Sequence, residues 1–428
     1  MINDIKIVEI NKKIRLHLIE SSKFKTDLIG IYIKRPLKES EASMNAVLTR
    51  MLERGTMKYK TTKEFNEKLD DLYGAVLVSD VHKYGEKHVF QFKMQIPDKK
   101  YIDSENIFEE SIEMLNEMIN NPLLIDGTFN EEFLKQEKRN LIQTIKSIKD
   151  DKVTYAIHKC IENMCENEPY RISQNGSVDE VEKINSENLY QHYRKVLKTS
   201  PIDICVIGDM EFDYIEKIIR KKLIFERDEI IKIDREKTDV EVNEVKLIEE
   251  EMDVTQAKLT LGYRTNIRYE DANYEASVLF ASILGGGASS KLFNEIREEK
   301  SLCYYIYAKL EKFKSIMLIA AGINSKDKEE VIELIKNSIL KIQNGEISDE
   351  ELKIAKKSVI SSLKARSDYP NSFINYYYDQ TLTRKNIDIG KTIKKYQSIS
   401  INEIVEASKK IKLDTIHFIK EKVHLNEN

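Results

Sequence analysis

The chain is poor in the residues that break or cross-link a fold. Its 428 residues include no tryptophan, six prolines and fourteen glycines, so long regular elements should dominate. The four cysteines form neither a Cys-x-x-Cys pair nor a zinc-finger pattern; they are Cys160, Cys165, Cys205 and Cys303. In a chain of this length they indicate buried thiols in a reducing compartment rather than a disulfide framework.

Long hydrophobic runs and an excess of one charge are also missing. The longest apolar stretch, residues 316–323, is far too short to span a membrane, and residues 1–20 alternate charged and apolar side chains, unlike a signal peptide. The formal net charge is −4, which argues against nucleic acid as the main partner. We therefore expect a cytoplasmic protein that neither spans a membrane nor binds nucleic acid.

The chain does contain an order of elements that occurs twice. Alternating apolar residues predict strands, and amphipathic patterns predict helices. The first half has expected strands at 14–19, 27–34, 87–96 and 202–207 and expected helices at 45–54, 104–119, 130–149 and 180–196. The second half has expected strands at 256–263 and 315–322 and expected helices at 274–284, 328–343 and 349–366.

The repeat can be followed by residue where segment 130–150 is set against segment 348–368. The recurring residues are Glu132, Leu134, Lys135, Lys138, Lys146 and Asp150, which return as Glu350, Leu352, Lys353, Lys356, Lys364 and Asp368. A repeated order of elements indicates a duplicated unit. We therefore predict an α+β fold of two homologous domains, residues 1–224 and 252–428, joined by a charged linker at 225–251.

The expected helix near residue 50 carries a recognisable motif. The run Met51-Leu52-Glu53-Arg54-Gly55-Thr56 follows Ala46-Val47-Leu48-Thr49-Arg50. It resembles the run that follows the zinc-binding His-x-x-Glu-His motif in pitrilysin/insulinase-type metallopeptidases, the inverted zincins. The resemblance covers essentially the whole chain. It implies two domains of the insulinase or mitochondrial-processing-peptidase type, each an antiparallel-rich sheet packed with helices.

The resemblance also implies that the zinc-binding residues are lost. It places Ala46 at the first histidine, Thr49 at the glutamate and Arg50 at the second histidine, and it places Thr144 at the third ligand. Ala46 has no lone pair, Thr49 is no base at neutral pH, and Arg50 puts a fixed positive charge where a cation would bind. We expect no metal and no catalytic residue in this chain, and hence no peptidase activity by itself.

The histidines offer no substitute ligand set. They are His17, His82, His88, His158, His192, His417 and His424. No two are three or four residues apart, the spacing that lets two side chains on one helical face share a metal ion. The matching helix of the second domain has Ser277, Phe280 and Ala281 at these positions. We expect surface or structural roles for all seven histidines.

A second family feature is kept in the second domain. Residues 284–292 read Leu-Gly-Gly-Gly-Ala-Ser-Ser-Lys-Leu and precede Arg297, Ser301 and Tyr304. This segment resembles the family's Gly-rich helix end and its Arg-Glu-x-x-Gly-Leu-x-Tyr sequence. The resemblance implies that Arg297 and Tyr304 hold the substrate backbone near the scissile bond. Ser301 replaces the usual glycine, a change expected to shift the loop that aims Tyr304.

Structural explanations compete with these functional ones. Three consecutive glycines most often end a helix. Arg297 can instead pair with Glu298 or Glu299, as solvated surface charges commonly do. Tyr304 can instead belong to the core. The run Tyr376-Tyr377-Tyr378 is either a peptide-contact patch or, more commonly, a packed edge of a helix or strand.

The lost and retained residues together favour one function over two others. We expect a non-catalytic subunit that binds peptide substrate and pairs with a zinc-bearing homologous peptidase subunit, as in the inactive member of a bacterial peptidase pair. A self-associating homodimer that binds peptides without cleaving them is the second hypothesis, and a scaffold is the third. Arg297 and Tyr304 are needed for the first two functions only. No cofactor is expected here, because zinc is expected only in the partner subunit.

Overall fold

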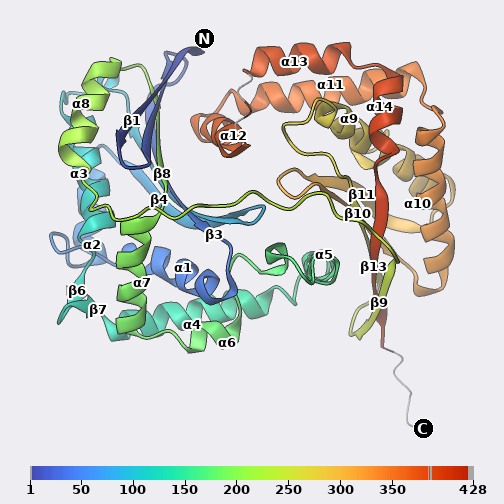
Figure 1. The fold of residues 1–428 in the computed structure, drawn as a ribbon, viewed down its shortest axis with the longest axis horizontal. Coiled ribbons are helices and arrows are strands. Elements are labelled where there is room, and N and C mark those ends of the chain that lie inside the picture. Colours follow the sequence, from blue (N-terminus) through green and yellow to red (C-terminus); the bar gives the residue numbers. More distant parts are fainter. Residues whose placement is uncertain (1, 384, 386–387, 423–428) are drawn as a thin grey trace, which may run out of the picture. The chain divides into compact units, whose positions relative to one another are not determined.

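The computed structural model describes residues 2–383, 385 and 388–422 (Figure 1). The chain forms two compact units, and neither is one continuous stretch of sequence. Unit one contains the residues up to 146, residues 172–235 and residues 368–378. Unit two contains residues 147–171, residues 236–367 and the residues from 379 onward. Each unit combines one large sheet with helices, which confirms the predicted α+β fold.

Unit one is built on a six-stranded sheet in the order β1-β2-β8-β3-β5-β4. Its strands are β1 (Ile2–Asn11), β2 (Ile14–Ser21), β3 (Thr26–Pro36), β4 (Val76–Tyr84), β5 (Lys87–Pro97) and β8 (Ile202–Gly208). Only the β2–β8 pair is parallel; the other neighbours are antiparallel. All seven residues of β8 are buried. This agrees with its mostly apolar sequence, Ile-Asp-Ile-Cys-Val-Ile-Gly, and with its place inside the sheet.

The helices of unit one bury their apolar faces in a single large core. They are α1 (Glu39–Leu52), α2 (Thr62–Asp71), α3 (Ile107–Asn120), α4 (Glu131–Ser147), α6 (Val178–Glu182), α7 (Ser186–Thr199) and α8 (Phe212–Lys222), with a small hairpin of β6 (Leu124–Ile125) and β7 (Thr128–Phe129). The single helix predicted over 180–196 is wrong. The chain breaks into α6 and α7 because Asn185 caps α7, accepting a hydrogen bond from Asn188 N at 2.8 Å.

Residues 368–378 bring the start of helix α12 (Pro370–Thr383) into unit one. The ring of Tyr378 stacks on Tyr32 of β3, with ring centroids 3.8 Å apart. The hydroxyl of Tyr377 lies 3.1 Å from Nδ1 of His17, whose Nε2 lies 3.1 Å from the buried carboxylate of Asp203. Both tyrosines are buried. Of the two explanations for the run of three tyrosines, the structure supports the packed helix edge.

Unit two is built on a five-stranded sheet in the order β11-β12-β10-β13-β9. Its strands are β9 (Lys246–Met252), β10 (Ala257–Arg264), β11 (Cys303–Glu311), β12 (Ile316–Ile323) and β13 (Lys412–Glu421). Its helices are α5 (Lys152–Met164), α9 (Tyr274–Gly285), α10 (Lys328–Gln343), α11 (Asp349–Arg366), α13 (Ile389–Ser398) and α14 (Ile401–Ser408). Figure 1 shows α5 and α10 on opposite faces of this sheet.

Helix α5 packs closely on β10 because the strand has a glycine there. A Cβ atom at Gly262 would come within 2.8 Å of the Met164 sulfur and 3.2 Å of the Cys160 sulfur. Any larger side chain would therefore push α5 away from the sheet. The close contact lets a segment from the first half of the sequence complete the core of unit two.

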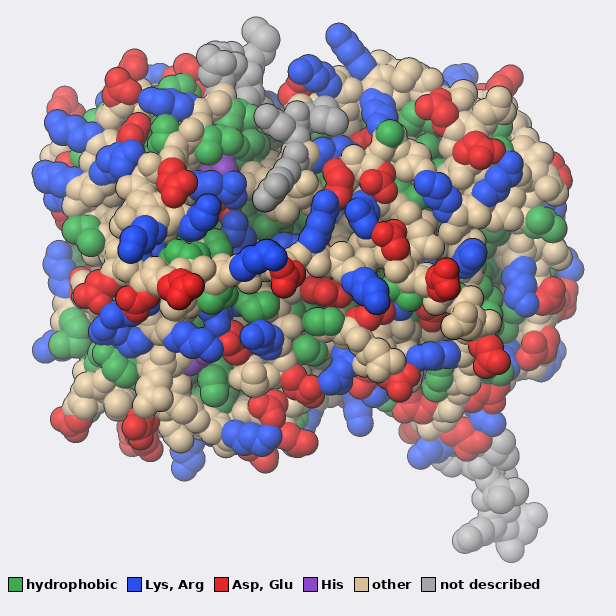
Figure 2. Space-filling model, viewed as in Figure 1, with side chains coloured by type: hydrophobic (Ala, Val, Ile, Leu, Met, Phe, Trp, Pro, Cys, Tyr) green, Lys and Arg blue, Asp and Glu red, His purple; other side chains and the backbone are tan. Residues whose placement is uncertain are grey.

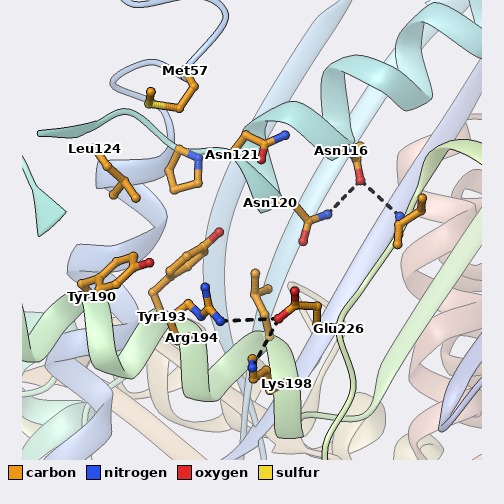
Figure 3. Close-up of a pocket in the computed structure, with 13 residues that line it drawn as sticks. Met57, Asn116, Asn120, Asn121, Leu124, Tyr190, Tyr193, Arg194, Lys198 and Glu226 are labelled. Carbon is orange, nitrogen blue, oxygen red and sulfur yellow. Dashed lines mark hydrogen bonds and ion pairs between the residues drawn. The ribbon is translucent and has the colours of Figure 1, made fainter. Parts of the chain in front are cut away.

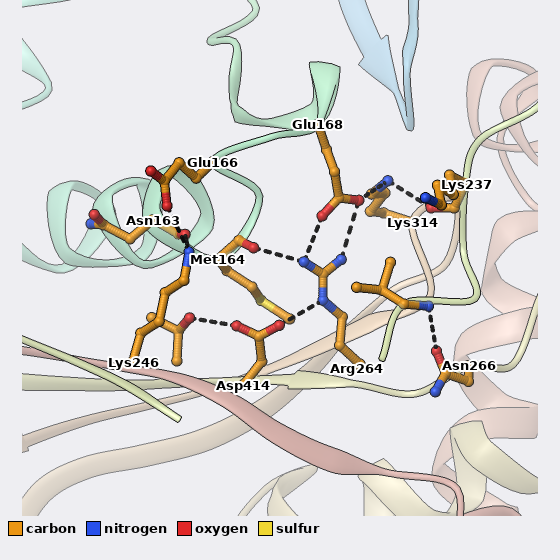
Figure 4. Close-up of polar contacts among 12 residues, drawn as sticks. Asn163, Met164, Glu166, Glu168, Lys237, Lys246, Arg264, Asn266, Lys314 and Asp414 are labelled. Carbon is orange, nitrogen blue, oxygen red and sulfur yellow. Dashed lines mark hydrogen bonds and ion pairs between the residues drawn. The ribbon is translucent and has the colours of Figure 1, made fainter. Parts of the chain in front are cut away.

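A buried ion network fixes the segment that follows α5 (Figure 4). Nη2 of Arg264 donates to Glu168 at 2.6 Å, and Nε of Arg264 donates to Asp414 at 2.9 Å. Nζ of Lys314 lies 2.5 Å from the Glu168 carboxylate. Burial acts to raise the pKa of Glu168, but hydrogen bonds from Arg264 and Lys314 hold that pKa below its usual value. The network joins η2 (Pro169–Arg171) and its neighbours to the sheet.

Charge is mixed on the surface, and no described helix is a membrane span. On the face shown in Figure 2, Lys and Arg side chains are interspersed with Asp and Glu side chains. Within the described residues, no helix combines the length and the apolar character that crossing a bilayer would need.

Candidate functional site

The first two positions of the lost zinc motif are occupied by residues of the α1 core. Ala46 is 3% exposed and belongs to the hydrophobic core of unit one. Thr49 is equally buried, and its hydroxyl donates to the Ala46 carbonyl oxygen at 3.0 Å. A threonine hydroxyl is not basic enough to take a proton from water at neutral pH, and here its own proton is held within the helix. These two positions therefore serve packing.

The third position has become part of an arginine–carboxylate cluster. Glu137 of α4 accepts from Nε of Arg54 at 2.7 Å and also contacts Nη2 of the same guanidinium. The guanidinium of Arg50 lies 3.9 Å from the other oxygen of Glu137. Glu137 is 6% exposed, so its charge requires such a partner. Arg50 and Arg54 therefore supply the positive charge that the buried Glu137 carboxylate needs.

The fourth position also holds no ligand. Thr144 lies on α4, and its hydroxyl donates to the Asn140 carbonyl oxygen at 3.0 Å. The four positions thus offer one methyl group, two hydroxyls bound to backbone and one cation, a set that does not fit zinc. Across the part of the chain that the structure describes, no three His, Cys, Asp or Glu side chains are grouped so that they could hold a metal ion.

The histidines take part in structural contacts instead. Asn45 of α1 lies between two of them, with its Nδ2 3.0 Å from Nδ1 of His88 and its Oδ1 2.6 Å from Nε2 of His192. Burial lowers the pKa of His88 to about 3 and that of His192 to about 4, so both are neutral at physiological pH. His17 joins Asp203 to Tyr377. His424 lies outside the described residues.

The edge strand beside α1 is already in contact with side chains of its own unit. Strand β4 is the last strand of the unit-one sheet. Its Ser79 amide donates to the Glu53 carboxylate at 3.0 Å, and its Val81 amide donates to Asp80 at 2.7 Å. Burial raises the pKa of Glu53. A peptide that added to this edge would have to displace these carboxylates, because an edge amide has one proton to donate.

Arg297 and Tyr304 lie in unit two, whereas the four zinc-motif positions lie in unit one. Arg297 is on the π-helical turn η3 (Phe293–Glu299), and its guanidinium stacks over the Phe293 ring at 4.7 Å. Neither Glu298 nor Glu299 forms an ion pair with it within the described structure. Tyr304 is 74% exposed near the start of β11, an edge strand. Tyr304 is therefore not a core residue.

The loop between them keeps a glycine-like backbone without a glycine. Ser301 has a φ of 55°, in the left-handed region. Serine thus adopts here a backbone conformation that glycine adopts more readily. Gly285, where α9 ends, allows close contact with β11, because a Cβ atom there would lie 2.5 Å from the Ala308 nitrogen. Gly287 follows with a φ of 142°. The glycine run therefore ends helix α9 and lets strand β11 pack closely against the helix end.

Two features of the site were not predicted from the sequence. Glu137 was missed, although Arg50 in the last turn of α1 and Arg54 just after its end put two cations close together in sequence and so indicate a carboxylate partner. The bonding of Glu53 to β4 was missed as well. A single charge after a helix does not reveal which strand amide it will meet.

Comparison with known proteins is consistent with this geometry. The Peptidase M16 inactive domain family matches residues 183–359. The chain is 32% identical over 405 residues to the probable inactive metalloprotease YmfF of Bacillus subtilis, covering 94% of this chain and 95% of the relative. It is 22% identical over 303 residues to the non-peptidase homolog YmxG of Helicobacter pylori, covering 69% and 68%.

A solved structure shows a closely similar fold. The crystal structure of a conserved protein from Enterococcus faecalis superimposes with a TM-score of 0.93 and 26% sequence identity. The match covers 99% of this chain and all of that one.

Proposed function

Because this chain belongs to the peptidase M16 family and is an inactive homologue within it, we propose that it is the non-catalytic subunit of a heterodimer with a zinc-bearing homologue. In this complex the partner supplies zinc and the activated water. This chain supplies groups that hold the peptide substrate. The observation that carries the proposal is the exposure of Arg297 and Tyr304 next to an edge strand, in a chain whose own zinc positions are filled by other chemistry.

Each exposed group has a role that follows from its chemistry. Arg297 can donate charge-assisted hydrogen bonds to a peptide carbonyl, because its guanidinium stacks on Phe293 and has no carboxylate partner among the described residues. The hydroxyl of Tyr304 can donate to an oxygen that gains negative charge during cleavage. Strand β11 can add an extended peptide to its edge. The amides of β11 bond to no described side chain, unlike those of Ser79 and Val81 in β4.

The test uses this chain mixed with a purified zinc-bearing homologue from the same organism. Arg297→Ala and Tyr304→Phe should leave the complex assembled by light scattering but lower its peptidase activity at least about tenfold, since losing one such donor typically costs roughly 100- to 1,000-fold. Arg366→Ala and Tyr369→Phe are matched controls, because both residues are exposed and lie outside the proposed site.

The outcomes are distinguishable. If both site variants cleave as fast as the parent complex, Arg297 and Tyr304 are structural. A scaffold role is then the better description. If no complex forms at micromolar concentration but labelled peptide binds to this chain alone, the self-associating peptide-binding hypothesis gains support instead.

A further inference from the structure

Unit one contains a pocket that the proposed function does not use. It lies between the C-terminal end of α3, the turn after it, helix α7 and the segment after α8 (Figure 3). Its volume is about 460 Å³, within the range of roughly 300–1,000 Å³ typical of ligand sites. All of its lining residues belong to unit one, whereas Arg297 and Tyr304 belong to unit two. The pocket is therefore a separate site.

One side of the pocket is apolar. Tyr190 and Tyr193 stand side by side on α7, with ring centroids 5.9 Å apart, and Leu197 is one turn beyond Tyr193. Two large apolar side chains at the pocket are strongly exposed, Met57 at 50% and Ile224 at 66%. Exposed apolar side chains gathered at a concave site indicate a binding surface, because covering them with another molecule lowers the free energy.

A second side offers unused amide groups. Oδ1 of Asn116 accepts from Nδ2 of Asn120 at 2.9 Å and from the backbone nitrogen of Ile224 at 3.2 Å. These bonds leave Nδ2 of Asn116 and Oδ1 of Asn120 without a hydrogen-bond partner in the described structure. One is a donor and the other an acceptor. Together they complement the N–H and C=O of a peptide group.

The third side carries a surplus of positive charge. Arg194 and Lys198 lie one turn apart on α7, and both contact a single carboxylate, Glu226, at 3.4 and 3.3 Å. Figure 3 shows the three side chains converging at one end of the pocket. The Glu226 side chain is 76% exposed, so these ion pairs are weak. Two cations that share one weak partner can accept a second carboxylate.

We propose that this pocket binds an extended peptide segment in which an apolar residue and an acidic residue are neighbours in sequence. The apolar side chain lies against Tyr190 and Leu197, and the acidic side chain pairs with Arg194 and Lys198. The peptide group between them meets Asn116 and Asn120. Glu226 acts as an internal competitor, because it occupies the two cations when no ligand is bound.

The absence of tryptophan from the chain allows a direct binding assay. In the peptide acetyl-Gly-Trp-Asp-Gly-amide the indole is the only tryptophan in the sample, so its emission reports burial in the pocket. Titration of the full-length protein should give a saturable shift of this emission to shorter wavelength. The charge-reversed peptide acetyl-Gly-Trp-Lys-Gly-amide should bind at least about threefold more weakly, because it meets Arg194 and Lys198 with like charge.

Variants separate this assignment from simple hydrophobic adhesion. Glu226→Gln should tighten binding of the Asp peptide by about two- to fivefold, since it frees both cations, whereas Lys198→Gln should weaken it by a similar factor. Glu187→Gln removes the same charge from α7 outside the pocket and should leave the affinity unchanged. The proposal is overturned if neither peptide shows saturable binding, if both bind equally, or if Glu226→Gln fails to tighten binding.

Discussion

Ser301 adopts a backbone conformation that suits glycine better than serine. Its φ of 55° lies in the left-handed region, which costs a residue with a Cβ atom about 1–2 kcal/mol. We expect Ser301→Gly to stabilise unit two by about 1 kcal/mol. Urea denaturation would measure the change in the free energy of unfolding. Ser361→Gly is the matched control, because the same substitution inside helix α11 should destabilise by about 0.5 kcal/mol. A loss of stability at Ser301 would contradict the strain argument.

Asp27 gives unit one a pH dependence. Burial, reinforced by the negative charge of Asp98, raises the pKa of Asp27 to about 7. An unfolded aspartate has a pKa of about 3.9, so the folded state binds this proton more tightly. The stability due to Asp27 is therefore complete below about pH 4 and is lost as the pH rises through about 7.

Replacing the carboxyl with an amide should remove this loss. We expect Asp27→Asn to raise the melting temperature at pH 8 but to bring little or no gain at pH 5. Thermal unfolding of both proteins across this range would measure the difference. Asp103→Asn, at an exposed carboxyl, should follow the parent profile. An equal gain for Asp27→Asn at both pH values would show that its protonation is not the cause.

At the scale of elements, the segment after α5 depends on one carboxylate. Glu168 contacts Arg264 and Lys314, which are 2% and 1% exposed. Glu168→Gln should destabilise unit two by about 3 kcal/mol, because removing one partner of a buried ion pair leaves the other charge poorly compensated. Glu166→Gln, two residues earlier, breaks an exposed pair with Lys246 and should cost under about 0.5 kcal/mol. Equal effects in urea denaturation would contradict this distinction.

The expected elements agree best with the structure where burial gives a clear pattern. The strand expected at 87–96 is observed as β5, Lys87–Pro97, because its apolar residues alternate against the core. Strand β4 was not predicted. Its Val76 and Val78 are 58% and 53% exposed. At this edge strand apolar side chains point to solvent, so their alternation does not mark the side that faces the core.

For the candidate site, too, some features could be predicted from the sequence and others could not. The family resemblance places Ala46, Thr49, Arg50 and Thr144 at the zinc-site positions, and the loss of zinc binding then follows from their residue types. The contacts that replaced those ligands cannot be derived in this way. The bonds from Arg54 to Glu137 and from Ser79 to Glu53 join residues far apart in sequence, or on different elements. They follow from packing, which local patterns do not encode.

At the scale of the whole molecule, the protein should be purified with far less than one zinc per chain. Changing Ala46, Thr49 and Arg50 together to His, Glu and His should still leave zinc weakly bound, because Thr144 is no ligand. Adding Thr144→Glu should complete the set and yield close to one zinc after dialysis. Elemental analysis would measure all three proteins. One tightly held zinc in the parent protein would refute the assignment of these four positions.

Assembly is the second prediction at this scale. The proposed heterodimer requires this chain and a zinc-bearing homologue to form a stable interface, which typically buries more than about 1,000 Å². Light scattering of an equimolar mixture at micromolar concentration should therefore give the mass of a one-to-one complex. Two separate monomers would count against the heterodimer, and a homodimer of this chain would favour the alternative.

The division of the sequence between units has a consequence for synthesis on the ribosome. Tyr32 of β3 is made early, but Tyr377 and Tyr378, which cover that face of the unit-one sheet, come after residue 370. Helix α5 likewise emerges long before β10 and β13, the strands it packs on. At about 5–20 residues per second, the chain from 208 to 378 takes roughly 10–30 s to make. During that interval the nascent protein exposes unfinished apolar surfaces, so its folding yield should depend on chaperones that shield the first half until the second arrives.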